Sequence, residues 1–241
     1  MAVSFVAAGT AATGSQDDLT PALPTGHALN DVLILVAVQW GTTTPGMVTG
    51  GWTSFASGIA DSTTDNVAFN VLYKMDGGSE TAPTVDFTAD LNFTTIAQIA
   101  AFRGVDTGDP IGEVGTVFTD TSTASATIGP ITAVTPGRVD GAVVVFGAKG
   151  NNWADSVNLL TGDSLTWVEI GEPDPSGGNN AGAVWDYALF GSIPTLTSKT
   201  FTTISATSDA RGGVMFVVQA PGAAAAGPPS LVMAPYREPR G

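Results

Sequence analysis

Apolar and polar side chains alternate with a period of two along several segments of the chain, a pattern typical of β-strands. The clearest examples are residues 66–75, NVAFNVLYKM, and residues 183–189, AVWDYAL, where Leu189 is predicted to end the buried face. In the first segment, the positions predicted to face solvent are Ala68, Asn70, Leu72 and Lys74. No window of helical length shows a 3.6-residue apolar stripe, so the pattern predicts an all-β protein.

A different pattern marks residues 32–38, VLILVAV, which are apolar at every position. A strand of this kind needs cover on both faces, whereas a lone two-layer sandwich covers only one face of each sheet. The second cover must come from another part of the chain, from a long loop or from another subunit. A similar run within residues 139–149, VDGAVVVFGAK, favours cover by a sister copy of the same unit.

The similarity of these two runs is part of a longer internal repeat with an offset of about 109 to 115 residues. NDVLILVAVQW aligns with VDGAVVVFGAK, which places Asp31 opposite Asp140. Downstream, the aligned aromatic pairs are Trp52 with Trp167, Tyr73 with Tyr187, and Phe87 with Phe201. Such self-similarity indicates an old internal duplication.

Each repeat contains about seven short predicted strands separated by Gly, Pro, Asn and Asp clusters, as in β-sandwiches. We therefore predict a jelly-roll or Ig-like antiparallel β-sandwich built from two tandem repeats, residues 1–107 and 108–220. The repeats join face to face or edge to edge, and the sequence leaves open whether they form two domains or one continuous sandwich.

Residues 221–241 depart from this pattern, because they begin with a linker rich in Ala, Pro and Gly that cannot form a core. We interpret the segment as an extended C-terminal arm that docks on a partner, and folding back onto its own sandwich is the alternative. The predicted docking residues are Leu231, Val232, Met233, Tyr236, Arg237 and Arg240.

Charge and composition exclude several classes of partner. The chain has 22 acidic and 8 basic residues, a formal net charge of −14, so it repels the phosphates of nucleic acids and anionic membrane surfaces. It contains no Cys, which excludes disulfides and thiolate metal sites. The N-terminal residues lack a basic region, and no apolar run approaches the roughly 18 residues of a membrane span. We expect a soluble protein made in a cytoplasm.

Candidate chemistry is sparse. His27, the only histidine, lies in a predicted turn, LPTGHALND, and we assign it to the surface. The acidic residues fall in predicted loops without a catalytic motif, and no Asp spacing typical of an EF-hand is present, although loop carboxylates leave calcium open. Gly-rich segments lack the pattern that binds phosphates. We predict no catalytic residues, no resident metal and no cofactor.

The five tryptophans fall into two groups. Trp52, Trp167 and Trp185 lie within predicted strands and are assigned to the core. Trp40 and Trp153 follow the first long strand of each repeat, near predicted loops. Exposed aromatic rings at such places stack on sugars or pack against a neighbouring subunit, and we favour the subunit contact.

Residues 30–112 resemble a β-sandwich family common in tailed bacteriophages and prophages. In that family a strand of the type DLLVAFV precedes a P-x-GWT turn, a YYKVADGSE hairpin and an AAFRGVDT-x-PI ending. Here the longer TPGMVTGGWT departs from the turn. The matching residues are Tyr73, Lys74, Asp76, Gly77, Ser79, Glu80, Ala101, Phe102, Arg103, Gly104, Val105, Asp106, Thr107, Pro110 and Ile111. Within FRGVDT we expect Arg103 to pair with Asp106 and fix the crossover between repeats.

The resemblance implies a non-enzymatic virion structural protein on the particle surface, contacting other virion proteins and copies of itself. Capsid decoration is favoured, because a small protein with a clamp-like terminus suits repetition over a lattice. A tail appendage or receptor-binding subunit is the alternative. Two other hypotheses are a carbohydrate-binding module that recognises a host surface glycan through Trp40 and Trp153, and a polysaccharide lyase or hydrolase, which lacks an acid–base pair.

Overall fold

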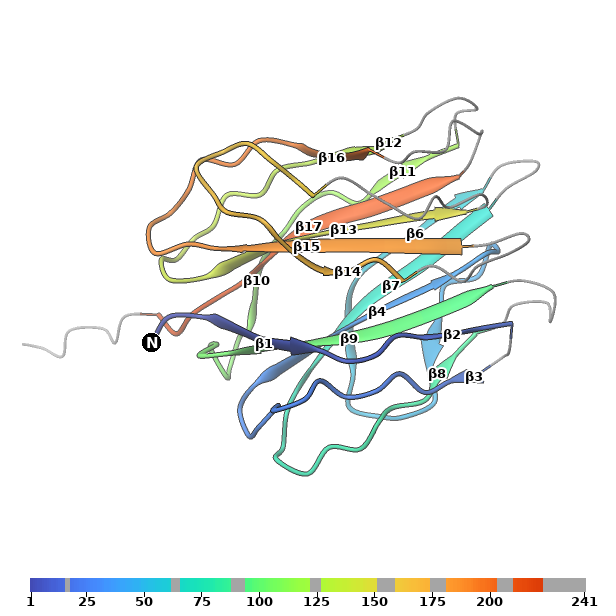
Figure 1. Ribbon diagram of the computed structural model, residues 1–241, viewed down its shortest axis with the longest axis horizontal. Coiled ribbons are helices and arrows are strands. Elements are labelled where there is room, and N and C mark those ends of the chain that lie inside the picture. Colours follow the sequence, from blue (N-terminus) through green and yellow to red (C-terminus); the bar gives the residue numbers. More distant parts are fainter. Residues whose placement is uncertain are drawn as a thin grey trace, which may run out of the picture.

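The computed structural model describes residues 1–15, 18–61, 66–87, 94–121, 127–150, 159–173, 181–202 and 210–222. Within these ranges the regular structure consists of β-strands, and all of their pairings are antiparallel. The chain therefore folds as an all-β sandwich, as the sequence predicts (Figure 1).

The first half of the chain forms one large and one small sheet. The large sheet has the order β1-β9-β4-β7-β6, with β2 also pairing with β9, and the small sheet has the order β3-β8-β5. The strands are β1 Ser4–Ala8, β2 Ala12–Gly14, β3 Asp18–Leu19, β4 Val32–Gln39, β5 Gly46–Met47, β6 Thr53–Asp61, β7 Asn66–Met75, β8 Val85–Asp86 and β9 Thr95–Arg103.

The second half repeats this arrangement. Its large sheet has the order β10-β17-β13-β15-β14, with β11 also pairing with β17, and β12 and β16 form the small sheet. The strands are β10 Ile111–Val114, β11 Phe118–Asp120, β12 Thr127–Ile131, β13 Ala142–Gly150, β14 Val168–Gly171, β15 Ala181–Leu189, β16 Lys199–Thr202 and β17 Arg211–Val218.

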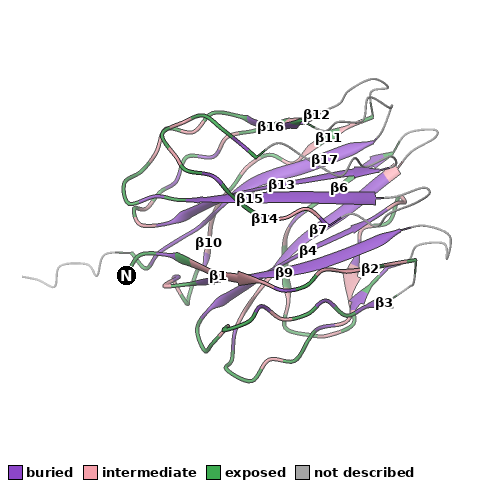
Figure 2. Cartoon of the chain, viewed as in Figure 1, coloured by how far each residue is buried: buried purple, intermediate pink, exposed green. Residues whose placement is uncertain are grey.

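The described strands stack in four layers, with the two large sheets face to face at the centre and a small sheet outside each of them (Figure 1). The central core combines side chains from both halves, among them Val36 of β4 and Phe146 of β13. The inner strands of both large sheets are buried almost throughout, and exposure is concentrated in the connections and outer strands (Figure 2). The two repeats thus share one core, in addition to the core that each forms with its small sheet.

This layering explains why β4 is apolar at every position. Ile34 and Val36 face the sister sheet in the central core, whereas Leu33 and Leu35 face the small sheet of their own half. The predicted sister cover therefore exists on one face, and the other face is covered locally. Burial of a Val, Leu or Ile side chain contributes about 1.5–3 kcal/mol, so both faces stabilise the fold.

The same layering corrects two predictions made from the alternating segments. Ala68, Asn70 and Leu72 of β7 do not face solvent but are buried, because the loop before β6 and the small sheet cover that side. Asn70 is accommodated there by hydrogen bonds, accepting from Ser54 Oγ at 2.6 Å and donating to the carbonyl of Pro45 at 2.9 Å. Leu189, predicted to be buried, ends β15 and is 43% exposed.

The two halves agree in local detail as well as in strand order. An irregularity of register interrupts the pairing of β6 with β7 at Phe55, and an equivalent one interrupts β14 with β15 at Ile170. Asn30 (φ 70°) and Asp140 (φ 60°) both adopt the left-handed conformation just before the first long strand. These shared irregularities support the internal duplication, because bulges and left-handed residues depend on specific local sequences.

They also correct the alignment of the repeats by one residue. Val32 and Ala142 both begin a strand that pairs with the last strand of its half, opposite Phe102 and Val218 respectively. Asp140 is therefore equivalent to Asn30, and the equivalent of Asp31 is Gly141. The aligned aromatic pair Tyr73 and Tyr187 is correct, since each lies opposite the start of the strand that precedes it in its half.

Steric and polar complementarity joins the two large sheets. A Cβ atom at Gly212 would lie 2.4 Å from Phe69 Cε1, and one at Gly58 would lie 2.7 Å from the same atom, so both glycines make room for this ring. In the same core, Trp185 Nε1 donates to Gln98 Oε1 at 2.8 Å, and Gln98 Nε2 donates to the carbonyl of Gly9 at 3.2 Å. The contacts between the sheets therefore use different residue types from each half.

Candidate functional site

A group of charged side chains lies at the end of the first half where β9 leaves the sheet. Arg103 binds the carboxylate of Asp31 through two hydrogen bonds, from Nε to Oδ1 at 2.8 Å and from Nη2 to Oδ2 at 2.7 Å. Arg103 Nη2 also donates to the carbonyl of Gly26 at 2.9 Å. The Asp31 side chain is 1% exposed, and its hydrogen bonds raise the pKa of Arg103 further above the usual range.

The expected pairing of Arg103 with Asp106 is therefore wrong. Asp106 instead accepts from Arg138 Nη1 at 2.5 Å and from the backbone N–H of Gly108 at 2.9 Å. The hydrogen bond from Arg138 is the main reason why the pKa of Asp106 is lowered. Arg138 also donates to the carbonyl of Ala220 at 3.2 Å, so it ties the crossover between the repeats to the residues after β17.

His27 belongs to the same end of the molecule. Its Nδ1 lies 2.5 Å from Oδ2 of the buried Asp76, and the histidine side chain is 22% exposed. Asp76 Oδ1 accepts from the N–H of Gly78 at 2.6 Å, and the backbone N–H of Asp76 donates to the carbonyl of Asp31 at 2.8 Å. His27 therefore holds a turn together.

The second half replaces this charged group with apolar packing. The backbone N–H of Phe190 donates to the carbonyl of Gly141 at 2.9 Å, which is the hydrogen bond that Asp76 makes to Asp31 in the first half. A Cβ atom at Gly141 would lie 2.6 Å from Phe190 Cζ, so the ring fills the place of the Asp31 side chain. The same position serves ionic stabilisation in one half and packing in the other.

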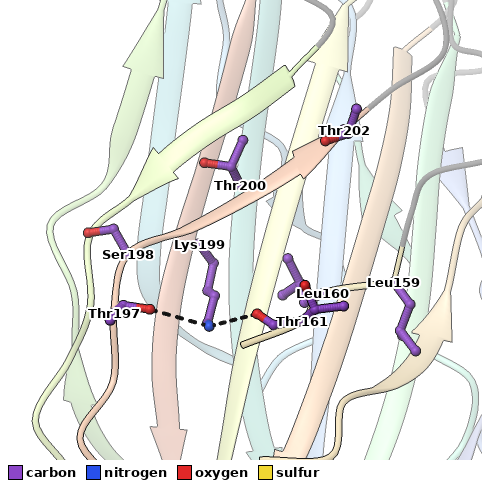
Figure 3. Close-up of a pocket in the computed structure, with 8 residues that line it drawn as sticks. All are labelled: Leu159, Leu160, Thr161, Thr197, Ser198, Lys199, Thr200 and Thr202. Atoms are coloured by element: carbon purple, nitrogen blue, oxygen red, sulfur yellow. Dashed lines mark hydrogen bonds between the residues drawn. The ribbon is translucent and has the colours of Figure 1, made fainter. Parts of the chain in front are cut away.

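A hollow with a volume of about 580 Å³ lies on the second half. Figure 3 shows its lining, which is rich in hydroxyl groups and comes from the segment before β14 and from β16 with the residues before it. The residues are Leu159, Leu160, Thr161, Thr197, Ser198, Lys199, Thr200 and Thr202.

Lys199, the only charged side chain of this lining, is held within the protein. Its Nζ lies 2.5 Å from Asp163 Oδ2 and donates to the carbonyl of Thr161 at 3.1 Å and to Thr197 Oγ1 at 3.5 Å. Nζ also lies 5.3 Å from the centre of the Trp167 ring. An ammonium group has three donors. Since these contacts surround Nζ with protein atoms, Lys199 links two loops rather than offering a nucleophile or an anion site.

Asp186 is a second buried charge in this region. Its Oδ2 accepts from the N–H of Leu160 at 2.9 Å, and burial raises the pKa of Asp186 to about 6, with further contributions from Glu169 and Glu172. The structure places Leu72 of the first half at the position of Asp186. The sequence alignment through Phe87 and Phe201 places Val85 opposite Lys199. The sequence alignment contained this signal, since a charge opposite an apolar residue marks a specialised position.

Two further buried cations lie where β13 ends and β17 begins. Lys149 and Arg211 are directly opposite each other on β13 and β17, and both are almost fully buried. Arg211 pairs with Asp120 and donates to the carbonyl of Thr127 at 2.5 Å. The first half has Gln39 and Thr95 opposite each other at this place, so a neutral pair corresponds to two cations.

Of the residues predicted to stack on glycans or to dock on a partner, Trp40 lies in the described part of the chain. Trp40 is partly buried and packs against the central core, with its backbone N–H donating to the carbonyl of Thr94 at 3.2 Å. Trp153 and the arm residues lie outside the described residues. These are Leu231, Val232, Met233, Tyr236, Arg237 and Arg240.

In the described part of the chain, no group of at least three His, Cys, Asp or Glu side chains is arranged to hold a metal ion. Nor does that part contain a helix long and apolar enough to cross a membrane. Comparison with known proteins found no matching family model, no matching curated protein and no matching solved structure.

Proposed function

We propose that this chain is a non-enzymatic structural protein displayed on the surface of a bacteriophage particle, with capsid decoration favoured over a position on the tail. The observation that carries the proposal is the resemblance of residues 30–112 to the phage β-sandwich family. Two features of the fold support it independently: the distribution of charge and the use of the motif residues.

The charges on the surface are compatible with an outer position on a particle. Five of the eight Lys and Arg residues form ion pairs with carboxylates, and Lys149 is buried. The described surface therefore presents an excess of carboxylates over cations, which disfavours contact with packaged nucleic acid. A net negative surface also keeps particles dispersed.

The residues of the resembling motif serve the architecture. Lys74 pairs with Glu80 across the hairpin after β7 at 2.5 Å, Arg103 holds Asp31, and Asp106 holds Arg138. These are contacts within the protein, which agrees with a family in which the motif maintains the sandwich. The proposed interactions with partners then belong to the arm and to the outer surface.

Particles from the bacterium that carries this protein provide the test. Prophage induction, purification of particles by density gradient and quantitative mass spectrometry give the copy number of the chain relative to the major shell protein. We expect copurification at a copy number comparable with that of the shell protein, and antibody labelling over the head. A copy number comparable with that of tail proteins would place it on the tail, and absence from particles would overturn the proposal.

The arm is tested in the same particles. A chain that lacks residues 221–241 should remain folded, because none of the described strands includes them, and should no longer be incorporated. The matched control is Val48→Glu, which changes a residue that is 63% exposed and leaves the arm intact. Normal incorporation of the shortened chain would contradict a docking role for the arm.

A further inference from the structure

An apolar groove lies at the end of the first half, beside the ion pair of Arg103 and Asp31. Its volume is about 280 Å³. Its lining combines the turn before β4, the residues after β9 and the last described segment of the chain. The residues are Met1, Leu29, Asn30, Asp31, Arg103, Gly104, Val105, Thr107 and Pro221.

The groove is open and apolar at its rim. Met1 is 91% exposed and Leu29 is 61% exposed, which makes them two of the most exposed large hydrophobic side chains in the described part of the chain. Two donor groups of Arg103 in the groove are satisfied by Asp31 and Gly26. An apolar ligand is therefore a better match for this groove than an anion.

The position of Pro221 connects the groove with the C-terminal segment. Pro221 is part of the lining, and the described chain ends at the next residue, Gly222. Residues 223–241 thus continue directly from the rim. They contain the apolar group Leu231, Val232 and Met233, whose side chains are of a size that such a groove accommodates.

The connection has the length and composition needed to return to the groove. The eight residues 223–230 span at most about 28 Å when extended, which is more than the width of a groove of this volume. Gly227, Pro228 and Pro229 lie in the second half of this connection, and Gly and Pro are the residues that favour chain reversal. A short tether also gives a high effective concentration at its own site.

We propose that residues 231–233 of the C-terminal segment dock in this groove of the same molecule. Docking removes Leu29 and Met1 from water together with the apolar side chains of the segment, and this burial is the driving force. Arg237 and Arg240 follow the docked residues and remain available to an acidic partner. The inference concerns the free protein and does not rest on the proposed function.

Paramagnetic relaxation in the chain of residues 1–241 tests the docking. The sequence has no Cys, so Ser230→Cys provides a single attachment site for a nitroxide label. With methyl-labelled protein, we expect the signals of Leu29 and Val105 to be several-fold weaker in the oxidised than in the reduced state. The methyl signals of Ile96, at the opposite end of β9, should be little affected. Equal intensities in the two states would overturn the proposal.

Two matched variants and a mixing experiment complete the test. Leu29→Glu places a charge in the groove and should abolish the broadening at Val105. Val48→Glu changes an equally exposed residue elsewhere and should preserve the broadening. Loss of the broadening in both variants would overturn the assignment to this groove.

When spin-labelled protein without isotopes is mixed with isotope-labelled protein without a spin label, no broadening is expected. Broadening in the mixture would show that a neighbouring molecule supplies the segment and would overturn docking within one chain.

Discussion

Trp185 of the second half donates its indole N–H to Gln98 of the first half inside the central core, at 2.8 Å. Both side chains are at least nine-tenths buried. The equivalent of Gln98 in the second half is Val214, so this polar side chain is specific to the first half, where it links the carbonyl of Gly9 to Trp185 of the other half. A buried hydrogen bond of this kind fixes how two apolar faces are placed against each other.

Gln98→Val should destabilise the protein by about 1–3 kcal/mol, because the indole N–H of Trp185 and the carbonyl of Gly9 lose their partner in the core. Urea denaturation gives the change in the free energy of unfolding. Trp185→Phe in the Gln98→Val background should cost less than Trp185→Phe alone. Additive costs would mean that the hydrogen bond does not couple the halves.

Gly212→Ala should destabilise the protein by about 1–3 kcal/mol, since the added methyl group would lie 2.4 Å from the ring of Phe69. The smaller side chain of Phe69→Leu should recover part of the lost stability in the double variant. Thermal unfolding of the two single variants and the double variant measures the coupling. The control is Gly50→Ala, because a Cβ atom there meets no atom within 4 Å. A cost at Gly50 equal to that at Gly212 would contradict the steric argument.

Asp186→Asn should change how stability depends on pH. The pKa of Asp186 is raised to about 6 in the folded protein by burial, so the folded state binds more protons than the unfolded state between about pH 4 and 6. The contribution of Asp186 to stability therefore falls as the pH rises through this range, by roughly 3 kcal/mol in all. Asn keeps an acceptor for the N–H of Leu160 and does not titrate.

The measurement is the difference in the free energy of unfolding between the wild type and Asp186→Asn at pH 4 and pH 7.5. The variant should gain relative to the wild type at the higher pH. Comparing the two proteins at each pH cancels the contributions of other carboxylates. A difference that does not depend on pH would show that Asp186 is not the titrating group.

Arg103→Gln should destabilise the protein by about 1–3 kcal/mol, because the carboxylate of Asp31 stays buried and loses two hydrogen bonds. Arg138→Gln is the matched comparison and should cost about 1 kcal/mol or less, since its partner Asp106 is 24% exposed and remains hydrated. Chemical denaturation of both variants establishes the order. A larger cost at Arg138 would reverse the assignment of the main ionic contact at this end.

Much of the fold is readable from the sequence because strand order and aromatic spacing survived the duplication. Trp52 and Trp167 precede equivalent strands, and Tyr73 and Tyr187 occupy equivalent positions. The exact alignment of the two repeats could not be read from the sequence, because an Asp occurs shortly before both long strands. The left-handed conformation shared by Asn30 and Asp140 and the pairing of Val32 and Ala142 with the last strand of each half show which residues correspond.

The errors have physical causes. The outer side of β7 was assigned to solvent because its cover includes β3, β5 and β8, which have two residues each and leave no periodic signal. Arg103 was paired with the nearby Asp106, whereas its true partner lies 72 residues earlier in the sequence. This contact depends on the pairing of β4 with β9, which places Val32 opposite Phe102 and which local spacing does not reveal.

The central position of the last strand affects how the chain is made. β9 ends at Arg103, which completes the first large sheet, whereas β17 lies between β10 and β13 and ends at Val218. At ordinary rates of translation, these two points are separated by on the order of ten seconds. For that interval the apolar face of the first large sheet lacks its cover in each nascent polypeptide, so high-level production depends on chaperones that bind this face until the second half is made.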